Sequence, residues 1–190
     1  FFVARVKGRL QHALRQAGTP VKFSRKVAMV SIGENQREDV EQYIQQHGAK
    51  EAHGDSALDE QLRPFTVVNS DVDLSLPSET TSGRYWYNLH LVLVHAERWR
   101  NANPQWLGKI RAQSFRIAAK KGYEISRLSV VPDHVHFCLR GNIEHSPEQI
   151  ALAFQNNLAY TLGQVRVWQA TYFVGTCGEY DMNAVRSWRR

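Results

Sequence analysis

The run from Glu124 to Arg140 constrains the fold most, because it predicts two neighbouring strands. EISRLSVV and HVHFCLR are rich in apolar and β-branched residues, and Pro132-Asp133 separates them. The residue before a proline disfavours helix, and Pro and Asp are both common in turns. The sequence therefore predicts a hairpin with strands at Glu124–Val131 and His134–Arg140.

Two helices and two further strands flank this hairpin. Residues 103–122 and 146–163 each begin with a capping residue followed by proline, carry apolar residues at helical spacing and end at a glycine. Residues 85–95 and 167–176 have the aromatic and β-branched composition of strands. The order β-α-β-β-α-β predicts an α+β, ferredoxin-like or RRM-like sandwich. Its helices would pack on one face of an antiparallel sheet, leaving the other face available for function.

Charge is unevenly distributed along the 190 residues. Seven basic and no acidic residues lie in 1–26, whereas residues 51–80 hold seven acidic residues and only Arg63 as a basic one. The net charge of +6 favours a polyanionic partner. We expect an amino-terminal helix-strand-helix extension at 1–50, an acidic linker at 51–83 and the sandwich domain at 84–190.

The cysteines and the apolar runs bear on the compartment. Cys138 and Cys177 are two lone thiols within apolar segments, which favours a reducing cytoplasm. No apolar run is long enough to cross a bilayer, and the first residues do not resemble a signal peptide. We expect a cytoplasmic, nucleoid-associated protein that does not bind membranes. The chain begins at Phe1 without a methionine, and the sequence leaves open whether it is a piece of a longer protein.

An internal repeat relates the two ends of the chain. Residues 10–43 align with residues 155–188 without gaps, and the register also keeps the hydrophobic pattern. The identical pairs are Gly18 with Gly163, Gly33 with Gly178, Glu34 with Glu179, and Val40 with Val185. In the same register, Tyr43 lies opposite Trp188.

The motif VVPDHVHFCL carries the clearest chemical signal. Residues two apart in a strand point to the same face, so His134 and His136 can offer two imidazoles to one metal ion. Val135 and Phe137 would then pack into the core. The alternative is that both histidines are ordinary polar residues of an amphipathic strand.

Three segments together resemble the single-tyrosine HUH transposases, including the REP-associated tyrosine transposases: YNLHLVLV, VVPDHVHFCL and VWQATYFVGTCGE. The resemblance covers residues 87–176, about half of the chain, and the repeat extends it to residues 22–47. It implies an HUH-type nuclease/transposase domain in which His134 and His136 bind Mg²⁺ or Mn²⁺. It also implies a tyrosine nucleophile on the helix after the last strand, a Gln one turn later at the metal, and a homodimer that exchanges this helix.

The sequence departs from that pattern at the nucleophile. Trp188 occupies the expected tyrosine position, and an indole cannot attack phosphorus. The amino-terminal copy of the repeat places Tyr43 there instead, with His47 four residues later on the same side of a helix. We therefore predict that Tyr43 is the nucleophile and His47 the third metal ligand, supplied by the same chain or by a second subunit.

Other polar residues are weaker candidates. Five cations are candidate phosphate contacts, although each could equally be a solvated surface charge: Arg25, Lys26, Lys120, Lys121 and Arg140. His90 is more simply a hydrogen-bonded strand residue, and Tyr180 a loop aromatic. Asp133 could orient a metal ligand but is equally a turn former.

The leading functional hypothesis is a metal-dependent endonuclease and transposase that cuts single-stranded DNA at a hairpin through a 5′-phosphotyrosine intermediate. Trp188 motivates an alternative, a catalytically silent, domesticated protein that binds hairpin DNA or RNA. A third reading is a metal hydrolase of small molecules. It is disfavoured because no Asp, Glu or Cys cluster lies near the histidine pair in the sequence to complete a tight Zn²⁺ site.

Overall fold

The computed structural model describes residues 2–180 except 53, 82, 99 and 165. The chain forms two compact units, one of Phe1–Met29 with Ser78–Tyr85 and the other of Val30–Pro77 with Trp86–Arg190. In the part of the chain that is described, no helix is both long and apolar enough to cross a membrane.

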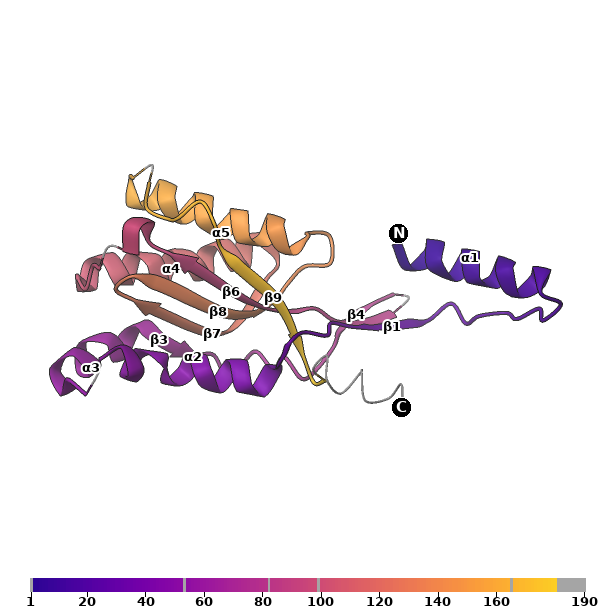
Figure 1. Ribbon diagram of the computed structural model, residues 1–190, viewed down its shortest axis with the longest axis horizontal. Coiled ribbons are helices and arrows are strands. Elements are labelled where there is room, and N and C mark those ends of the chain that lie inside the picture. The colour runs from indigo at the N-terminus through magenta and orange to yellow at the C-terminus, as the bar shows by residue number, and fades with distance from the viewer. Residues whose placement is uncertain (1, 53, 82, 99, 165, 181–190) are drawn as a thin grey trace. The chain divides into compact units, whose positions relative to one another are not determined.

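The smaller unit is built around helix α1 (Phe2–Gln16) and a three-stranded sheet in the order β1-β5-β4 (Figure 1). The strands are β1 (Val27–Val30), β4 (Ser78–Thr80) and β5 (Gly83–Trp86). Gly83 lies so close to β1 that an added Cβ would be 2.7 Å from the Val27 carbonyl oxygen. Close approach of two backbones therefore requires glycine at this position.

The larger unit contains a six-stranded sheet in the order β2-β9-β6-β8-β7-β3. The strands are β2 (Asn35–Gln36), β3 (Thr66–Val68), β6 (Asn88–Val94), β7 (Glu124–Val131), β8 (His134–Arg140) and β9 (Phe173–Gly178). The four central strands are antiparallel, β3 pairs antiparallel with β7, and β2 pairs parallel with β9. The order β6-α4-β7-β8-α5-β9 confirms the predicted β-α-β-β-α-β sandwich.

Helices α4 (Pro104–Lys121) and α5 (Pro147–Leu162) cover one face of this sheet, and α2 (Arg37–Glu51) lies on the other with α3 (Ser56–Leu62) next to it (Figure 1). The Asn103 side chain caps α4, and a capping box formed by Ser146 and Gln149 begins α5. Left-handed glycines, Gly122 and Gly163, end both helices as predicted. Two short 3-10 helices, η1 (Arg63–Phe65) and η2 (Ala96–Arg98), complete the elements.

The main core lies between the sheet and helices α4 and α5. Leu91, Val135 and Phe137 are fully buried there, because alternate residues of β6 and β8 point to that face. The remaining residues of β8, which include His134 and His136, point to the face under α2. A smaller cluster of Val40, Ile44, Leu74, Cys138 and Cys177 packs between α2 and the sheet.

The two copies of the internal repeat contact each other reciprocally. The Ser31 hydroxyl donates to the Cys177 carbonyl at 2.9 Å, and the Thr176 hydroxyl donates to the Ile32 carbonyl at 2.6 Å. Ser31 and Thr176 are equivalent in the repeat, and so are Ile32 and Cys177. The two hydrogen bonds are therefore related by the same pseudo-symmetry.

The equivalent glycines Gly33 and Gly178 make the close approach possible. A Cβ on Gly33 would lie 1.6 Å from the Thr176 carbonyl oxygen, and one on Gly178 would lie 2.3 Å from the Ser31 carbonyl oxygen. No side chain fits at either position, because the opposing backbone already fills the space. The glycines shared by the two copies thus mark the point where the copies meet.

Two predicted strands differ from the observed ones. The last strand begins at Phe173 and not at Val167, and residues 167–168 form a buried segment joined to the sheet by an isolated bridge between His95 and Trp168. Residues 167 and 168 are apolar because they are buried, although they do not belong to a regular strand. The predicted strand at 85–95 is divided at Tyr87, since β5 and β6 pair in different sheets.

The predicted domain boundaries also change. Residues 51–83 are not a bare linker, because they contain α3, η1, β3 and β4, and β3 extends the main sheet. Leu62, Phe65 and Leu74 in this segment are buried, which its acidic composition concealed. The helix that carries Tyr43 belongs to the larger unit, whereas α1 belongs to the smaller one.

Candidate metal and nucleophile site

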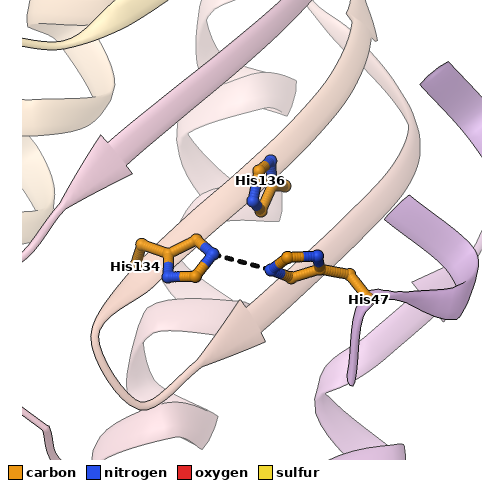
Figure 2. A group of neighbouring side chains, drawn as sticks. All are labelled: His47, His134 and His136. Carbon is orange, nitrogen blue, oxygen red and sulfur yellow. Dashed lines mark hydrogen bonds between the residues drawn. The ribbon is translucent and has the colours of Figure 1, made fainter. Parts of the chain in front are cut away.

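Helix α2 brings the amino-terminal candidates to the histidine pair on β8. His47, His134 and His136 are buried, and their ligand nitrogens all lie within 4.8 Å of one another (Figure 2). Figure 2 shows the His47 ring reaching from the helix towards the His134 ring on the strand. The structure thus brings His47 to a histidine pair that begins 87 positions later in the sequence.

The seating of α2 sets the position of His47. Val40, Ile44 and His47 follow one another at intervals of four and three residues, so they share one face of the helix. All three are buried. The Glu41 carboxylate accepts a hydrogen bond from Arg37 at 2.6 Å and pairs with Arg127 of β7 at 3.7 Å. Apolar contacts and an ion pair to the sheet therefore fix the rotation of the helix about its axis.

The Asp133 carboxylate orients His134. Its Oδ1 atom lies 2.6 Å from His134 Nδ1, and Arg98 donates to its other oxygen at 3.4 Å. An ionised carboxylate can only accept, so His134 Nδ1 carries a proton and the neutral ring presents a lone pair on Nε2. That Nε2 atom lies 2.7 Å from His47 Nε2.

His90 contacts Nδ1 of His136, as Asp133 contacts Nδ1 of His134. Its Nε2 atom lies 3.1 Å from His136 Nδ1, and the two rings are stacked with centroids 5.4 Å apart. This contact occupies Nδ1 of His136 and leaves its Nε2 atom for an ion. His90 lies on β6 next to β8, and the sequence alone does not show this cross-strand contact.

Burial keeps these imidazoles neutral. Burial, followed by the neighbouring histidines, lowers the pKa of His136 to about 2. Burial and then His134 lower the pKa of His47 to about 4, and burial lowers the pKa of His90 to about 4. At neutral pH these rings are in the form that binds a cation.

The ring nitrogens of His47, His134 and His136 are suitable ligands for a divalent cation. Three imidazoles meet with their ligand nitrogens within 4.8 Å of one another, and His47 Nδ1 is buried with no hydrogen-bond partner among the described residues. A shared cation would take the place of the hydrogen bond between His47 Nε2 and His134 Nε2 and would be held by one nitrogen of each ring. The described residues therefore form a possible metal site.

Tyr43 lies at the edge of this group. Its ring centroid is 5.0 Å from that of His47 and 5.4 Å from that of His136, and 39% of the residue is exposed. Burial and then the charge of Glu51 raise the pKa of its hydroxyl. The ammonium of Lys50 lies 5.0 Å from the Tyr43 ring centroid, a neighbour that sequence reasoning missed although it follows Tyr43 by two helical turns.

The predicted phosphate contacts do not gather at this site. Arg140 is a correction, because its guanidinium is buried and bonds to Glu124 and to the carbonyls of Asp73 and Leu76. These hydrogen bonds use both terminal nitrogens, and the Nε atom is buried, so Arg140 has a structural role. Lys120 and Lys121 end α4, on the face of the sheet away from the histidines.

The other sequence candidates belong to other parts of the chain. Arg25 and Lys26 are exposed residues of the smaller unit. Tyr180 is about half exposed, at the end of the described chain. Trp188 lies outside the described residues.

Part of the chain matches a known family. Residues 84–188, more than half of the chain, match the family described as transposase IS200 like. The chain therefore belongs to the IS200-like transposase family, which confirms the resemblance inferred from the sequence.

Two solved structures are similar. A candidate transposase from Deinococcus radiodurans R1 is 18% identical, with 59% of this chain and 94% of that chain covered and a TM-score of 0.48. A REP-associated tyrosine transposase, solved bound to a REP hairpin, is 14% identical, with 53% and 60% covered and a TM-score of 0.41. No curated protein matches the chain.

Proposed function

We propose that this transposase-family chain cuts and joins single-stranded DNA with Tyr43 as the nucleophile and with His47, His134 and His136 as ligands of Mg²⁺ or Mn²⁺. The observation that carries the proposal is the position of α2, which holds the Tyr43 ring 5.0 Å from His47 and 5.4 Å from His136. We expect the substrate to be a single strand next to a hairpin.

The reaction we propose exchanges one phosphate ester for another. The Tyr43 oxygen bonds to phosphorus while the bond from phosphorus to the 3′-oxygen breaks, which leaves a 5′-phosphotyrosine and a 3′-hydroxyl. The phenol loses its proton, and the departing 3′-oxygen gains one. A cation on the three imidazoles would neutralise charge that builds on the phosphoryl oxygens. Attack by another 3′-hydroxyl reverses the step and joins strands.

Lys50 is placed to assist the loss of the phenol proton. Burial and Glu51 raise the pKa of the Tyr43 hydroxyl, so the resting group is protonated. An ammonium 5.0 Å from the ring centroid favours the phenolate that forms as the new bond is made. We therefore assign Lys50 a supporting electrostatic role.

The donor set bears on the choice of cation. Mg²⁺ prefers oxygen ligands, whereas Mn²⁺ accepts imidazole more readily. Three histidines with no carboxylate among the proposed ligands favour Mn²⁺ at least as much as Mg²⁺. We expect both ions to support the reaction, with Mn²⁺ effective at the lower concentration.

We also propose that Tyr43 acts on the site of its own chain. Val40 and Ile44 are buried against the sheet that carries the histidines, and Glu41 pairs with Arg127 of that sheet. A dimer that exchanged α2 would form the same interactions between subunits, so the proposal rests on α2 making them within one chain here. A homodimer, if it forms, would then be held by other surfaces.

A covalent-adduct assay tests the proposal. End-labelled hairpin oligonucleotides with single-stranded flanks are incubated with the protein and Mn²⁺, and adducts are resolved on a denaturing gel. We expect an adduct that EDTA abolishes and that Tyr43→Phe removes. Tyr160→Phe is the matched control, because Tyr160 is 89% exposed on α5, on the other face of the sheet. An adduct that persists in Tyr43→Phe, or none from the wild-type protein, refutes the proposal.

Trp188 favours a second candidate, a binder of hairpin DNA or RNA without catalysis, because the family's tyrosine position holds an indole. This candidate predicts hairpin affinity that is unchanged in a His134→Ala, His136→Ala double variant. It is excluded if the wild-type protein cleaves DNA in a metal-dependent way.

A further inference from the structure

A hollow opens beside the candidate nucleophile. Its volume is about 470 Å³, within the usual range of ligand pockets. Tyr43 and His136 form part of its wall, so whatever occupies it lies next to the proposed reaction centre. The rest of the wall comes from Asn35, Asp39, Val40, His90, Val92 and Phe173.

Phe173 gives this hollow a fixed aromatic wall. Its ring meets His90 nearly edge-on, with centroids 5.3 Å apart and planes at 66°. The ring also lies over Gly175, where an added Cβ would be 3.1 Å from the Phe173 Cζ atom. Even so, 51% of Phe173 is exposed. An aromatic residue that is held in place and still exposed is suited to stacking.

The hollow also has a polar edge. Asn35 is held by the parallel pairing of β2 with β9, where it lies opposite Cys177, and Asp39 lies in the first turn of α2. Both residues are exposed. An amide offers donors and an acceptor, and an ionised carboxylate offers acceptors only. These are the groups needed to read the Watson–Crick edge of an unpaired base.

We propose that this hollow binds one unpaired nucleobase of the DNA strand, with the base stacked on Phe173 and its edge towards Asn35 and Asp39. Its position relative to the cleaved phosphate rests on the proposed function, but base binding itself does not. Cytosine, adenine and guanine carry amino groups that Asp39 can accept from. Thymine presents carbonyl oxygens on both sides of its single N–H, so the hollow disfavours it.

Binding measurements in EDTA test the proposal without any reaction. The probes are short oligonucleotides of dC, dA or dT, and affinity is read from fluorescence anisotropy. We expect Phe173→Ala to weaken binding of oligo-dC about tenfold, and Phe173→Tyr to bind like the wild type. Tyr160→Ala removes an exposed aromatic residue far from the hollow and should leave affinity unchanged.

Base preference gives a second readout. The wild-type protein should bind oligo-dC and oligo-dA more tightly than oligo-dT, and Asp39→Asn should reduce that difference. An oligonucleotide with a single abasic position should bind wild type less tightly than its parent, and Phe173→Ala should no longer distinguish the two.

The outcomes distinguish base binding in the hollow from the proposed cleavage reaction. If Phe173→Ala binds as the wild type does and Asp39→Asn keeps the base preference, the hollow is not a base site, whether or not DNA is cleaved. If no adduct forms but affinity falls as described, base binding stands and the proposed function fails. Circular dichroism of each variant checks that the fold is intact.

Discussion

At the scale of single residues, the neighbours of the histidines decide which nitrogen can bind a cation. Asp133 occupies Nδ1 of His134, and His90 occupies Nδ1 of His136. A neutral imidazole has one N–H, so a ring that donates from Nδ1 has a lone pair on Nε2. His134 is thereby prepared to bind through Nε2, and a cation on Nε2 of His136 would place the proton of that ring on Nδ1, with His90 as its acceptor.

His90 should therefore contribute to metal affinity without being a ligand. Replacing it with phenylalanine removes the acceptor for His136 Nδ1, and we expect Mn²⁺ affinity to fall about tenfold to a hundredfold. His90→Gln keeps an oxygen that can accept the hydrogen bond and should retain most of the affinity. Titration followed by the paramagnetic resonance of free Mn²⁺ measures both variants. Equal affinities for His90→Phe and the wild type would contradict this role.

The depressed pKa values also make stability depend on pH. His47, His90 and His136 have pKa values in the folded state below the unfolded value of about 6.5. The unfolded state then binds more protons in acid, so stability is full above pH 7 and is lost as the pH falls through 6 towards 4.

We expect the free energy of unfolding in EDTA to decrease from pH 7 to pH 5 by up to about 2 kcal/mol for each such histidine, and by less for the partly exposed His90. Urea unfolding at the two pH values measures this. His47→Gln, which cannot titrate, should show a smaller decrease. An identical decrease in that variant would show that His47 does not contribute.

At the scale of elements, local signals predicted whole helices and strands. The bounds of α4, α5, β7 and β8 follow from caps, terminal glycines and the period of apolar residues, all of which act within a few residues. The start of β9, the break at Tyr87 and the strand β3 could not be predicted this way. They depend on which distant segment pairs with them or buries them.

The site residues also divide into those that local patterns predict and those that depend on long-range contacts. His134 and His136 were predictable from the two-residue period of a strand, and Tyr43 and His47 from the repeat and the helical period. The contact of His90 with His136 depends on cross-strand register, which no local pattern records. Asp133 adjoins His134 in the chain and Lys50 follows Tyr43 by two helical turns, so these two contacts are local. Arg140 was assigned wrongly because its partners come from two other segments, Glu124 from one and Asp73 and Leu76 from another.

The ion pair between Glu41 and Arg127 should hold α2 in place. In Arg127→Gln, the buried Glu41 is left with one of its two cations, and we expect stability to fall by about 1–3 kcal/mol and hydrogen exchange in α2 to become faster. Arg63→Gln removes an exposed pair with Asp59 and should cost less than about 1 kcal/mol. Equal effects of the two substitutions would show that Glu41 and Arg127 do not fix the helix.

At the scale of the whole molecule, charge is divided between the two units. The smaller unit contains the segment with seven basic residues and no acidic one, and its Arg25 and Lys26 are exposed. Lysine and arginine that meet phosphates release counterions, so their contribution appears in the salt dependence of binding. We therefore propose that the basic residues of this unit, most of which lie outside the segment that matches the family, contribute to binding of a polyanion.

Replacing Arg25 and Lys26 with glutamine should lower the slope of log affinity against log salt by about 0.7 for each single-strand phosphate that is no longer neutralised. Anisotropy titrations over a range of salt concentrations give the slope. The same substitutions at Lys120 and Lys121, on the face of the sheet opposite the histidines, should leave it unchanged. A change of slope only in the second pair would assign DNA binding to α4 instead.

The interlocked glycines have a consequence for the order of events during synthesis. The backbone at Gly33 leads into α2, yet it rests against residues 176–178, which the ribosome makes much later. Helix α2, which carries Tyr43, therefore cannot complete its packing until strand β9 has left the ribosome. We therefore expect the proposed nicking activity to appear only after nearly all of this domain has been translated.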